Sequence, residues 1–317
     1  MKKVFGPVPS RRLGFSLGVD LVPFKTCTLD CVYCQLGPTT HKTLKRKEYI
    51  PTEEILPEVE KVLNKGKRID YITFSGSGEP TLHSGIGKMI SRIKRISSIP
   101  VAVITNGTLL NQGQVQEDLW AADLVIPSLD AVDERIFQRI NRPHASLNTK
   151  MFIRGLDDFA GKFPGKIWLE VMLVRGLNDS KEHIQKIANI TGRLPVEKVQ
   201  LNTPHRPPAE DFARTVSSLD LRRQDRIFGG NCEIIPDLTP AREKILPNEE
   251  TENMAEAILS LIKRRPVSLD DISLALGGSR NEILKYLEFW STRGKIKSEF
   301  IRGKGTTRRE IKGFSIF

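Results

Sequence analysis

Short runs rich in β-forming residues alternate with longer helical patterns through most of this 317-residue chain. The predicted strands lie at 14–21, 69–74, 100–105, 122–127, 166–174 and 197–202, with amphipathic segments such as 52–65, 86–96, 133–140 and 181–191 between them. Repeated strand–helix units imply a parallel sheet with right-handed crossovers. We therefore expect an α/β fold, a partial (β/α)6 TIM-like barrel, whose chemistry gathers at the carboxyl ends of the strands.

Three cysteines follow the first predicted strand within one short loop, Cys27, Cys31 and Cys34, in the spacing C-x3-C-x2-C. Three thiolates this close together can bind three irons of a cubane cluster and leave the fourth iron open to a substrate. A zinc knuckle is the alternative, but zinc usually takes four ligands in two pairs, and no second pair follows here. Cys232 stands alone, which is typical of a small core residue; a substrate-linked thiol or an auxiliary ligand is the alternative.

The cysteine window, with Tyr33 directly before the last cysteine, resembles the signature of the radical S-adenosylmethionine (radical SAM) superfamily, and the resemblance spans roughly residues 14–206. It implies a [4Fe–4S] cluster on Cys27, Cys31 and Cys34, with the amino and carboxylate groups of S-adenosylmethionine on the open iron. One electron then cleaves the sulfonium and releases a 5′-deoxyadenosyl radical. The resemblance also implies a flavodoxin- or ferredoxin-like electron donor. No pattern indicates a second cluster, a cobalamin domain or a flavin domain.

The same resemblance assigns cofactor contacts to the ends of the predicted strands. Glycines let a backbone approach a ligand closely, and the segment Gly76, Ser77, Gly78 and Glu79 is expected to bind the amino group of S-adenosylmethionine. Tyr33 is expected near the adenine. The other cofactor candidates are Asn106, Ser128, Asp130, Arg175 and Asn202. Ser128 and Asp130 would bind the ribose or the methionine carboxylate, although Asp130 would alternatively cap the helix that begins near residue 133.

Charged residues near the mouth of the barrel are candidates for substrate binding. Arg11 and Arg12 precede the cysteine loop, and His205 and Arg206 follow the last predicted strand. Alternatively, the two arginines pair with acidic residues at the surface, and His205 and Arg206 lie in a loop that faces solvent. Glu170 interrupts an apolar strand, so it is expected to be paired or functional because burying a lone carboxylate is costly. An outward position against a helix is the alternative for Glu170.

The pattern changes near residue 251, so we divide the chain into a barrel (1–206), a covering and linking region (207–250) and a tail (251–317). The tail shows helical patterns at 254–262, 268–276 and 280–293 and two strands at 295–301 and 308–316, which indicates a winged helix. Its third helix offers Arg280, Asn281 and Lys285 to a nucleic acid, but its glutamates would repel phosphates. Nucleic-acid and protein recognition therefore both stay open, and a structural appendage is a third alternative.

A net charge of +11 favours an acidic partner such as RNA or DNA, although a lysine-rich surface gives the same value. No apolar run approaches the roughly 20 residues of a membrane span, and no signal-peptide core follows the first residues. We therefore expect a cytoplasmic protein without a membrane partner.

Two functions compete on this evidence. The first is a radical SAM enzyme whose tail delivers a macromolecule, either RNA, as in wybutosine-type tRNA enzymes, or protein, as in glycyl-radical activating enzymes. The second is an iron–sulfur regulator that binds DNA through the tail without catalysis. The regulator leaves residues 76–80 and the strand–helix units without a purpose.

Overall fold

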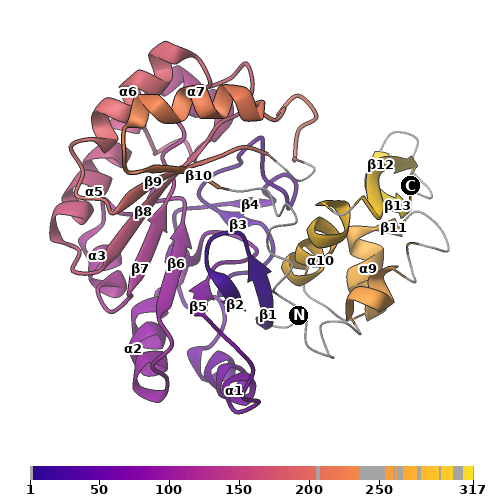
Figure 1. Cartoon of the computed structure of the whole chain (residues 1–317). Coiled ribbons are helices and arrows are strands. Elements are labelled where there is room, and N and C mark those ends of the chain that lie inside the picture. Colours follow the sequence, from indigo (N-terminus) through magenta and orange to yellow (C-terminus); the bar gives the residue numbers. More distant parts are fainter. Residues whose placement is uncertain are drawn as a thin grey trace.

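The computed structural model describes residues 3–204, 208–235, 254–259, 262, 267–276, 280–292, 294–302 and 310–316. Its main feature is an eight-stranded sheet in the order β1-β2-β5-β6-β7-β8-β9-β10, flanked by helices (Figure 1). Neighbouring strands from β2 to β10 are parallel, and β1 pairs with β2 in the antiparallel sense. This arrangement confirms the predicted α/β partial barrel.

The six predicted strands are all present. They are β2 (Gly14–Val19), β5 (Tyr71–Phe74), β6 (Val101–Thr105), β7 (Leu124–Pro127), β8 (Lys166–Met172) and β9 (Lys198–Asn202). Most are apolar along their whole length because helices cover one face and the barrel interior covers the other. Two short strands, β3 (Thr26–Cys27) and β4 (His41–Lys42), pair beside the cysteine loop.

The barrel helices are α1 (Thr52–Leu63), α2 (Ile86–Ile96), α3 (Gly113–Leu119), α4 (Glu134–Ile140), α5 (Thr149–Lys162), α6 (Lys181–Thr191) and α7 (Ser218–Phe228), with a 3₁₀ turn at Pro80–Leu82. Polar caps fix several helix starts: Asp133 accepts from two amides of α4, and Asn148 and Ser180 accept from the first turns of α5 and α6. Among the described residues, no helix is both long and apolar enough to span a bilayer.

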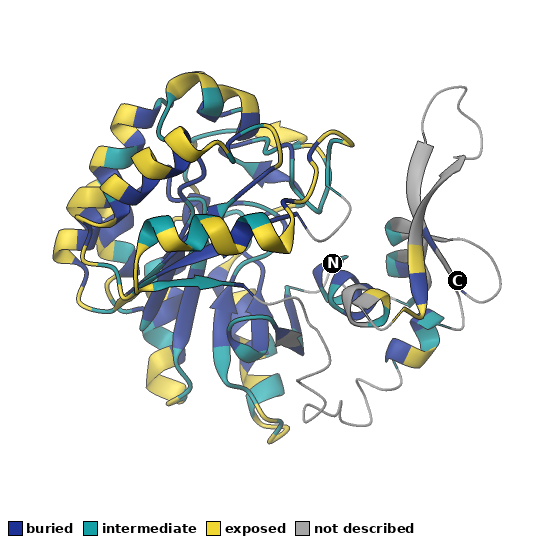
Figure 2. Ribbon diagram, turned by 45° about the horizontal axis from the view of Figure 1, so that its top comes forward, coloured by how far each residue is buried: buried dark blue, intermediate teal, exposed yellow. Residues whose placement is uncertain are grey.

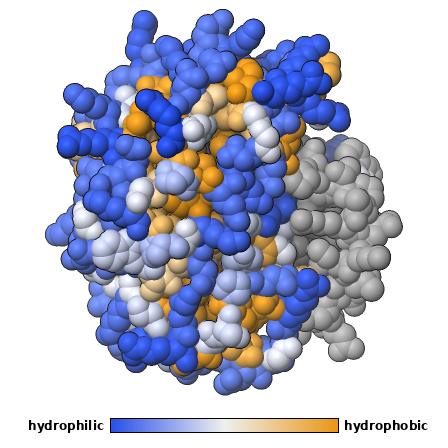
Figure 3. All heavy atoms as spheres, turned by 60° about the vertical axis from the view of Figure 1, so that its left-hand side comes forward, coloured by the Kyte–Doolittle hydropathy of each residue, from blue (hydrophilic) through white to orange (hydrophobic). Residues whose placement is uncertain are grey.

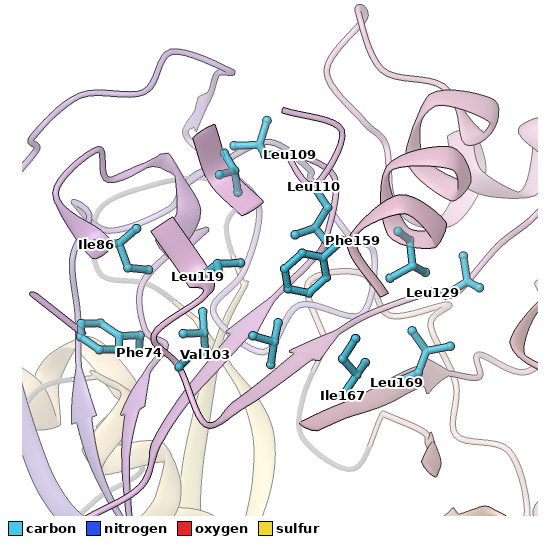
Figure 4. Packing of buried hydrophobic residues seen from close by; sticks show 14 of the residues in the cluster. Phe74, Ile86, Val103, Leu109, Leu110, Leu119, Leu129, Phe159, Ile167 and Leu169 are labelled. Carbon is cyan, nitrogen blue, oxygen red and sulfur yellow. The ribbon is translucent and has the colours of Figure 1, made fainter. Parts of the chain in front are cut away.

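Apolar side chains from the sheet and the helices form the main core. Phe74, Val103 and Leu169 project from the strands and are fully buried. Figure 4 shows them with Leu119 and Phe159, which come from α3 and α5. Figure 2 shows the strands buried and the exposed residues on the outer faces of the helices. The helix-covered side in Figure 3 is mostly hydrophilic, with apolar atoms gathered in patches among the charged residues.

Two strands that the sequence did not predict extend the sheet. β1 (Val4–Ser10) covers the edge of β2, and β10 (Cys232–Ile234) pairs in parallel with β9. β10 and α7 lie within residues 207–250, so the described part of that region belongs to the strand–helix series and is more than a linker. Sequence analysis missed β10 because it is only three residues long.

Over its described residues the tail contains the predicted helices and strands in their predicted order, with one short strand, β11, that the sequence did not predict. A helical segment at 254–259 is followed by β11 (Val267–Ser268), α9 (Leu269–Leu276), α10 (Arg280–Thr292), β12 (Ile296–Arg302) and β13 (Glu310–Ile316). The strands form a sheet in the order β11-β13-β12. A separate apolar cluster that includes Ile258, Ile272, Ile283 and Leu287 holds these elements together. The winged-helix assignment itself stays a prediction.

Candidate active site

A cavity of about 340 Å³ lies at the carboxyl ends of the parallel strands. Each strand from β5 to β9 contributes residues at or just after its end, and the cysteine loop contributes Cys27, Tyr33 and Cys34. Parallel strands bring their carboxyl ends to one edge of the sheet, which is why residues far apart in sequence meet here. Of the predicted residues, those that line this cavity are Arg11, Arg12, Cys27, Tyr33, Cys34, Gly76, Gly78, Glu79, Asn106, Ser128 and Asn202.

Each of the three cysteine sulfurs accepts an N–H donor. Asn106 Nδ2 lies 3.5 Å from Cys27 Sγ, and Lys25 Nζ lies 3.0 Å from Cys34 Sγ. The donor to Cys31 Sγ is the side-chain amide of Asn141, at 3.4 Å. A donor at each sulfur stabilises the thiolate form that binds iron. Lys25 and Asn141 were not predicted, and only their tertiary position reveals them.

Burial raises the pKa of Cys27 to about 12 and also raises that of Cys31, so both are neutral thiols before metal binds. Metal coordination deprotonates such thiols. Within the described residues, no three His, Cys, Asp or Glu side chains are placed to coordinate a single metal ion. A cubane cluster requires no such set, because each thiolate binds a different iron.

Asp130 connects the cysteine loop to the strand ends. Its carboxylate accepts from the Tyr33 hydroxyl, from Asn141 Nδ2 at 2.8 Å and from the Met172 amide at 2.9 Å. Asp133, and not Asp130, caps α4, so the capping alternative for Asp130 is wrong. Burial raises the pKa of Asp130 to about 6, against the opposing effect of these hydrogen bonds. Asp130 thus fixes the orientation of two side chains beside the cysteines.

The glycine segment after β5 is pressed against the start of the cysteine loop. A Cβ atom on Gly78 would lie 1.8 Å from the Thr26 carbonyl oxygen, so only glycine permits this approach. The Lys25 amide donates to the Ser77 carbonyl at 2.7 Å, and the Glu79 amide donates to the Thr26 carbonyl at 3.1 Å. The two segments therefore form one rigid floor of the cavity.

Two buried carboxylates hold that floor in place. Asp20, directly after β2, accepts from the amide and hydroxyl of Ser77. Glu79 accepts from the Asn106 amide at 2.8 Å and the Thr105 hydroxyl at 2.6 Å, and both the amide and the hydroxyl of Thr81 also donate to it. Burial raises the pKa of Glu79, while these donors oppose the rise. Asp20 was missed by sequence reasoning because an aspartate directly after a strand usually indicates a turn.

A charged network faces the cavity from β8, β9 and the turn after β1. Arg12 Nη2 lies 3.1 Å from Glu170 Oε2, and Arg12 Nη1 lies 3.2 Å from Gln200 Oε1. Asn202 donates to Glu170 at 2.7 Å and accepts from Arg11 at 3.2 Å. Burial alone would raise the pKa of Glu170, but the charge of Arg12 and these hydrogen bonds lower it. Glu170 is therefore paired inside the barrel, and the outward alternative is wrong.

Arg175 and Cys232 are not among the residues that line the cavity. Arg175 follows β8; it is exposed, and its contact with the cofactor stays a prediction. His205 and Arg206 lie outside the described residues. Cys232 is half-buried in β10 and is absent from the cavity wall, which leaves the small-core interpretation.

Helix α10 contributes a further wall of the cavity. Asn281 and Lys285 line it, and the Arg280 guanidinium lies 4.0 Å from the centroid of the Phe24 ring, beside the cysteine loop. Figure 1 shows α10 next to β1. The three residues that the sequence offered to a nucleic acid thus face the barrel in this structure.

Residues 21–190 match the Radical SAM superfamily. The chain is 40% identical over 285 residues to the UPF0026 protein MJ1312 of Methanocaldococcus jannaschii, covering 88% of this chain and 87% of that protein. It is 37% identical over 302 residues to a GTPase Obg of Brachyspira hyodysenteriae; this covers 95% of the chain but spans only 44% of that protein. A solved radical SAM methyltransferase from Sphaerobacter thermophilus has a similar fold, with a TM-score of 0.56, 18% identity and coverage of 69% of this chain and 65% of that one.

Proposed function

Because the chain belongs to the radical SAM superfamily, we propose that it is an enzyme that cleaves S-adenosylmethionine and abstracts a hydrogen atom from a second substrate. The superfamily uses a [4Fe–4S] cluster and S-adenosylmethionine, and these are the cofactors of this chain. When bound and reduced, the cluster supplies the electron that splits S-adenosylmethionine into methionine and a 5′-deoxyadenosyl radical. We assign the cluster to Cys27, Cys31 and Cys34.

The single observation that carries the assignment is the set of N–H donors at the three sulfurs, provided by Lys25, Asn106 and Asn141. Hydrogen bonds to cluster sulfurs are one of the ways a protein sets the properties of a cluster. Asn141 Oδ1 is also buried and has no hydrogen-bond partner among the described residues. A buried amide oxygen without a donor fits a bound group at this position.

The chain's own residues then orient the cofactor. The backbone of Gly76 and Gly78 lies open at the cavity wall and would receive the amino group of S-adenosylmethionine, while Asp20 holds the segment from behind. Ser128 and Asn202 line the cavity from the ends of β7 and β9 and are the proposed contacts for the ribose and the carboxylate. Asp130 serves as a positioning residue, because its carboxylate is occupied by three donors.

The second substrate would enter beside the tail, since α10 forms one wall of the cavity. The proposed class is a macromolecule, RNA or protein, of which a single group reaches the cavity. A flavodoxin- or ferredoxin-like protein is the proposed electron donor. The competing DNA-binding regulator would need Arg280, Asn281 and Lys285 on an open surface. Their position against the barrel supports the enzyme instead.

The test is anaerobic reconstitution with iron and sulfide, followed by reduction with S-adenosylmethionine present and an assay for 5′-deoxyadenosine. We expect product from the unaltered chain and none from Cys31→Ala. Cys232→Ala is the matched control, because that thiol lies outside the cavity wall, and it should retain product formation. A cluster that assembles without yielding 5′-deoxyadenosine, in a chain that binds DNA, would favour the regulator.

A further inference from the structure

Residues 41–47 form a basic segment that begins with β4, directly beside the cysteine loop. His41, Lys42, Lys45 and Lys47 of this segment are exposed, and we call these four residues the basic surface. Exposed cations gathered at one place produce a positive field, which steers molecules that carry negative charge toward that place.

The charges of the three lysines are not neutralised by the fold. No ion pair joins Lys42, Lys45 or Lys47 to any described residue. Lys42 Nζ donates to the backbone carbonyl of Arg142 at 3.0 Å, and Lys47 Nζ lies 4.8 Å from the centroid of the Tyr49 ring. Neither a carbonyl nor an aromatic ring carries a net charge, so the surface stays positive.

Two acidic residues near this segment are engaged with other groups. Glu48 accepts hydrogen bonds from the amide and the hydroxyl of Thr52, both at 2.7 Å. Asp118 forms an ion pair with Arg46, the remaining basic residue of the segment. Arg46 is therefore the cation that the fold neutralises, whereas the lysines on either side of it are presented to solvent.

The backbone of this segment is hydrogen-bonded to the first cysteine of the loop. β4 pairs with β3 in parallel and places Lys42 opposite Cys27. The Thr43 amide donates to the Cys27 carbonyl at 2.9 Å, and the His41 amide donates to the Lys25 carbonyl at 3.1 Å. A molecule docked on the basic surface would thus lie beside a proposed ligand of the cluster.

The basic surface is separate from the reaction cavity. None of residues 41–47 is among those that line it. A substrate must place its reacting group inside the cavity, whereas a partner that delivers electrons needs only to come close to the cluster. RNA would be attracted by the same charges, but docking here would not direct a nucleotide into the cavity. The position of the surface therefore favours an electron carrier over a substrate.

We propose that the basic surface is the docking site of an electron-carrier protein with an acidic surface. The inference rests on the proposed function, in which Cys27 binds one iron of the cluster, and it names where the electron donor binds and by which charges. In the transfer step the reduced carrier loses one electron and the oxidised cluster gains it, and no bond forms or breaks. Complementary charges raise the rate at which the two proteins meet.

The experiment mixes the reconstituted full-length chain with a fully reduced, negatively charged flavodoxin, without S-adenosylmethionine. Stopped-flow absorbance follows the flavodoxin semiquinone that forms when one electron passes to the cluster. Replacing Lys45 and Lys47 together by Glu should lower the second-order rate constant about tenfold or more at low salt, because steering raises association rates by roughly 10–10³. The difference should disappear near 1 M salt, where charges are screened within about 3 Å.

A matched control changes the net charge equally at another place. Lys61 on α1 and Lys186 on α6 are exposed lysines, and replacing both by Glu should leave the rate constant within about twofold, because distant charges are screened. Photoreduced deazaflavin, a small reductant that needs no docking site, should reduce the unaltered chain and both variants at equal rates. That equality excludes a damaged cluster or a folding defect as the cause of slow reduction.

Three results would overturn the proposal: a rate for the unaltered chain that does not fall with salt, a basic-surface variant that is reduced as fast as the unaltered chain, or a control variant that is slowed equally. A variant reduced at the normal rate that has lost binding of transfer RNA would assign the surface to RNA instead. Rapid reduction through this surface in a chain that yields no 5′-deoxyadenosine would refute the proposed function and leave the docking site standing.

Discussion

Replacing Asp20 with Asn should change how the stability of the chain depends on pH. Asp20 is 4% exposed, and burial raises its pKa from 3.8 to about 6, although the Ser77 hydroxyl and amide both donate to it. Between these two values the folded chain holds a proton that the unfolded chain has lost. The contribution of Asp20 to stability therefore falls as pH rises from 4 to 6, by about 3 kcal/mol at 1.36 kcal/mol per pKa unit.

Urea unfolding of the cluster-free chain and of Asp20→Asn, at intervals between pH 4 and pH 8, measures this term. Subtracting the two free energies of unfolding cancels every other titrating group. Relative to the unaltered chain, the free energy of unfolding of Asp20→Asn should rise by about 3 kcal/mol between pH 4 and pH 8. The change should be complete a little above pH 6. Any hydrogen bond that Asn makes less well adds a constant of about 1 kcal/mol, which does not alter the slope.

The control is Asp158→Asn on α5, where hydrogen bonds from Lys162 and Gln116 lower the pKa. A lowered pKa stabilises the fold above the ordinary value of 3.8, and this stability is lost only as pH falls below about 4, so the difference for this control should stay nearly flat between pH 4 and pH 8. A difference for Asp20→Asn that is as flat between pH 4 and pH 8 as that of the control would refute the argument that Asp20 is buried at a cost.

Two more predictions concern the cysteine loop. Lys25→Met removes the cation that lies 3.0 Å from Cys34 Sγ. Because a nearby positive charge favours the reduced, more negative cluster, the reduction potential of the cluster should fall by roughly tens of millivolts. For a one-electron couple, about 59 mV corresponds to a tenfold change in the equilibrium constant. A redox titration followed by electron paramagnetic resonance checks this, and an unchanged or higher potential would contradict it. Gly78→Ala would place a Cβ atom 1.8 Å from the Thr26 carbonyl oxygen, so the loop must shift and cluster assembly, followed by iron–sulfur absorbance, should be lost. Gly113→Ala, where a Cβ meets nothing within 4 Å, should assemble a normal cluster.

The strands and many of the helices were predictable because their signals are local. An apolar run of five residues or an amphipathic stretch such as Ile86–Ile96 forms its element wherever it is packed. The same reasoning placed glycines and polar residues at strand ends, and parallel topology then brings those ends together. Edge strand β10 escaped prediction because only its pairing with β9 makes it a strand.

The contacts that define the site were decided by tertiary structure. Asn141 is 110 residues from Cys31 in sequence, and Arg12 is 158 residues from Glu170. No local pattern shows that these atoms meet, because their pairing follows from the burial of polar groups that must find partners inside the fold. The same holds for α10, whose sequence suggests a surface reader but whose Asn281 lines the cavity. The cysteines and the strand–helix order were thus enough to indicate the chemistry that this chain can carry. Only the folded chain decided which side chains hold the thiols and enclose the cavity, since those contacts depend on distances between segments that the linear order does not contain.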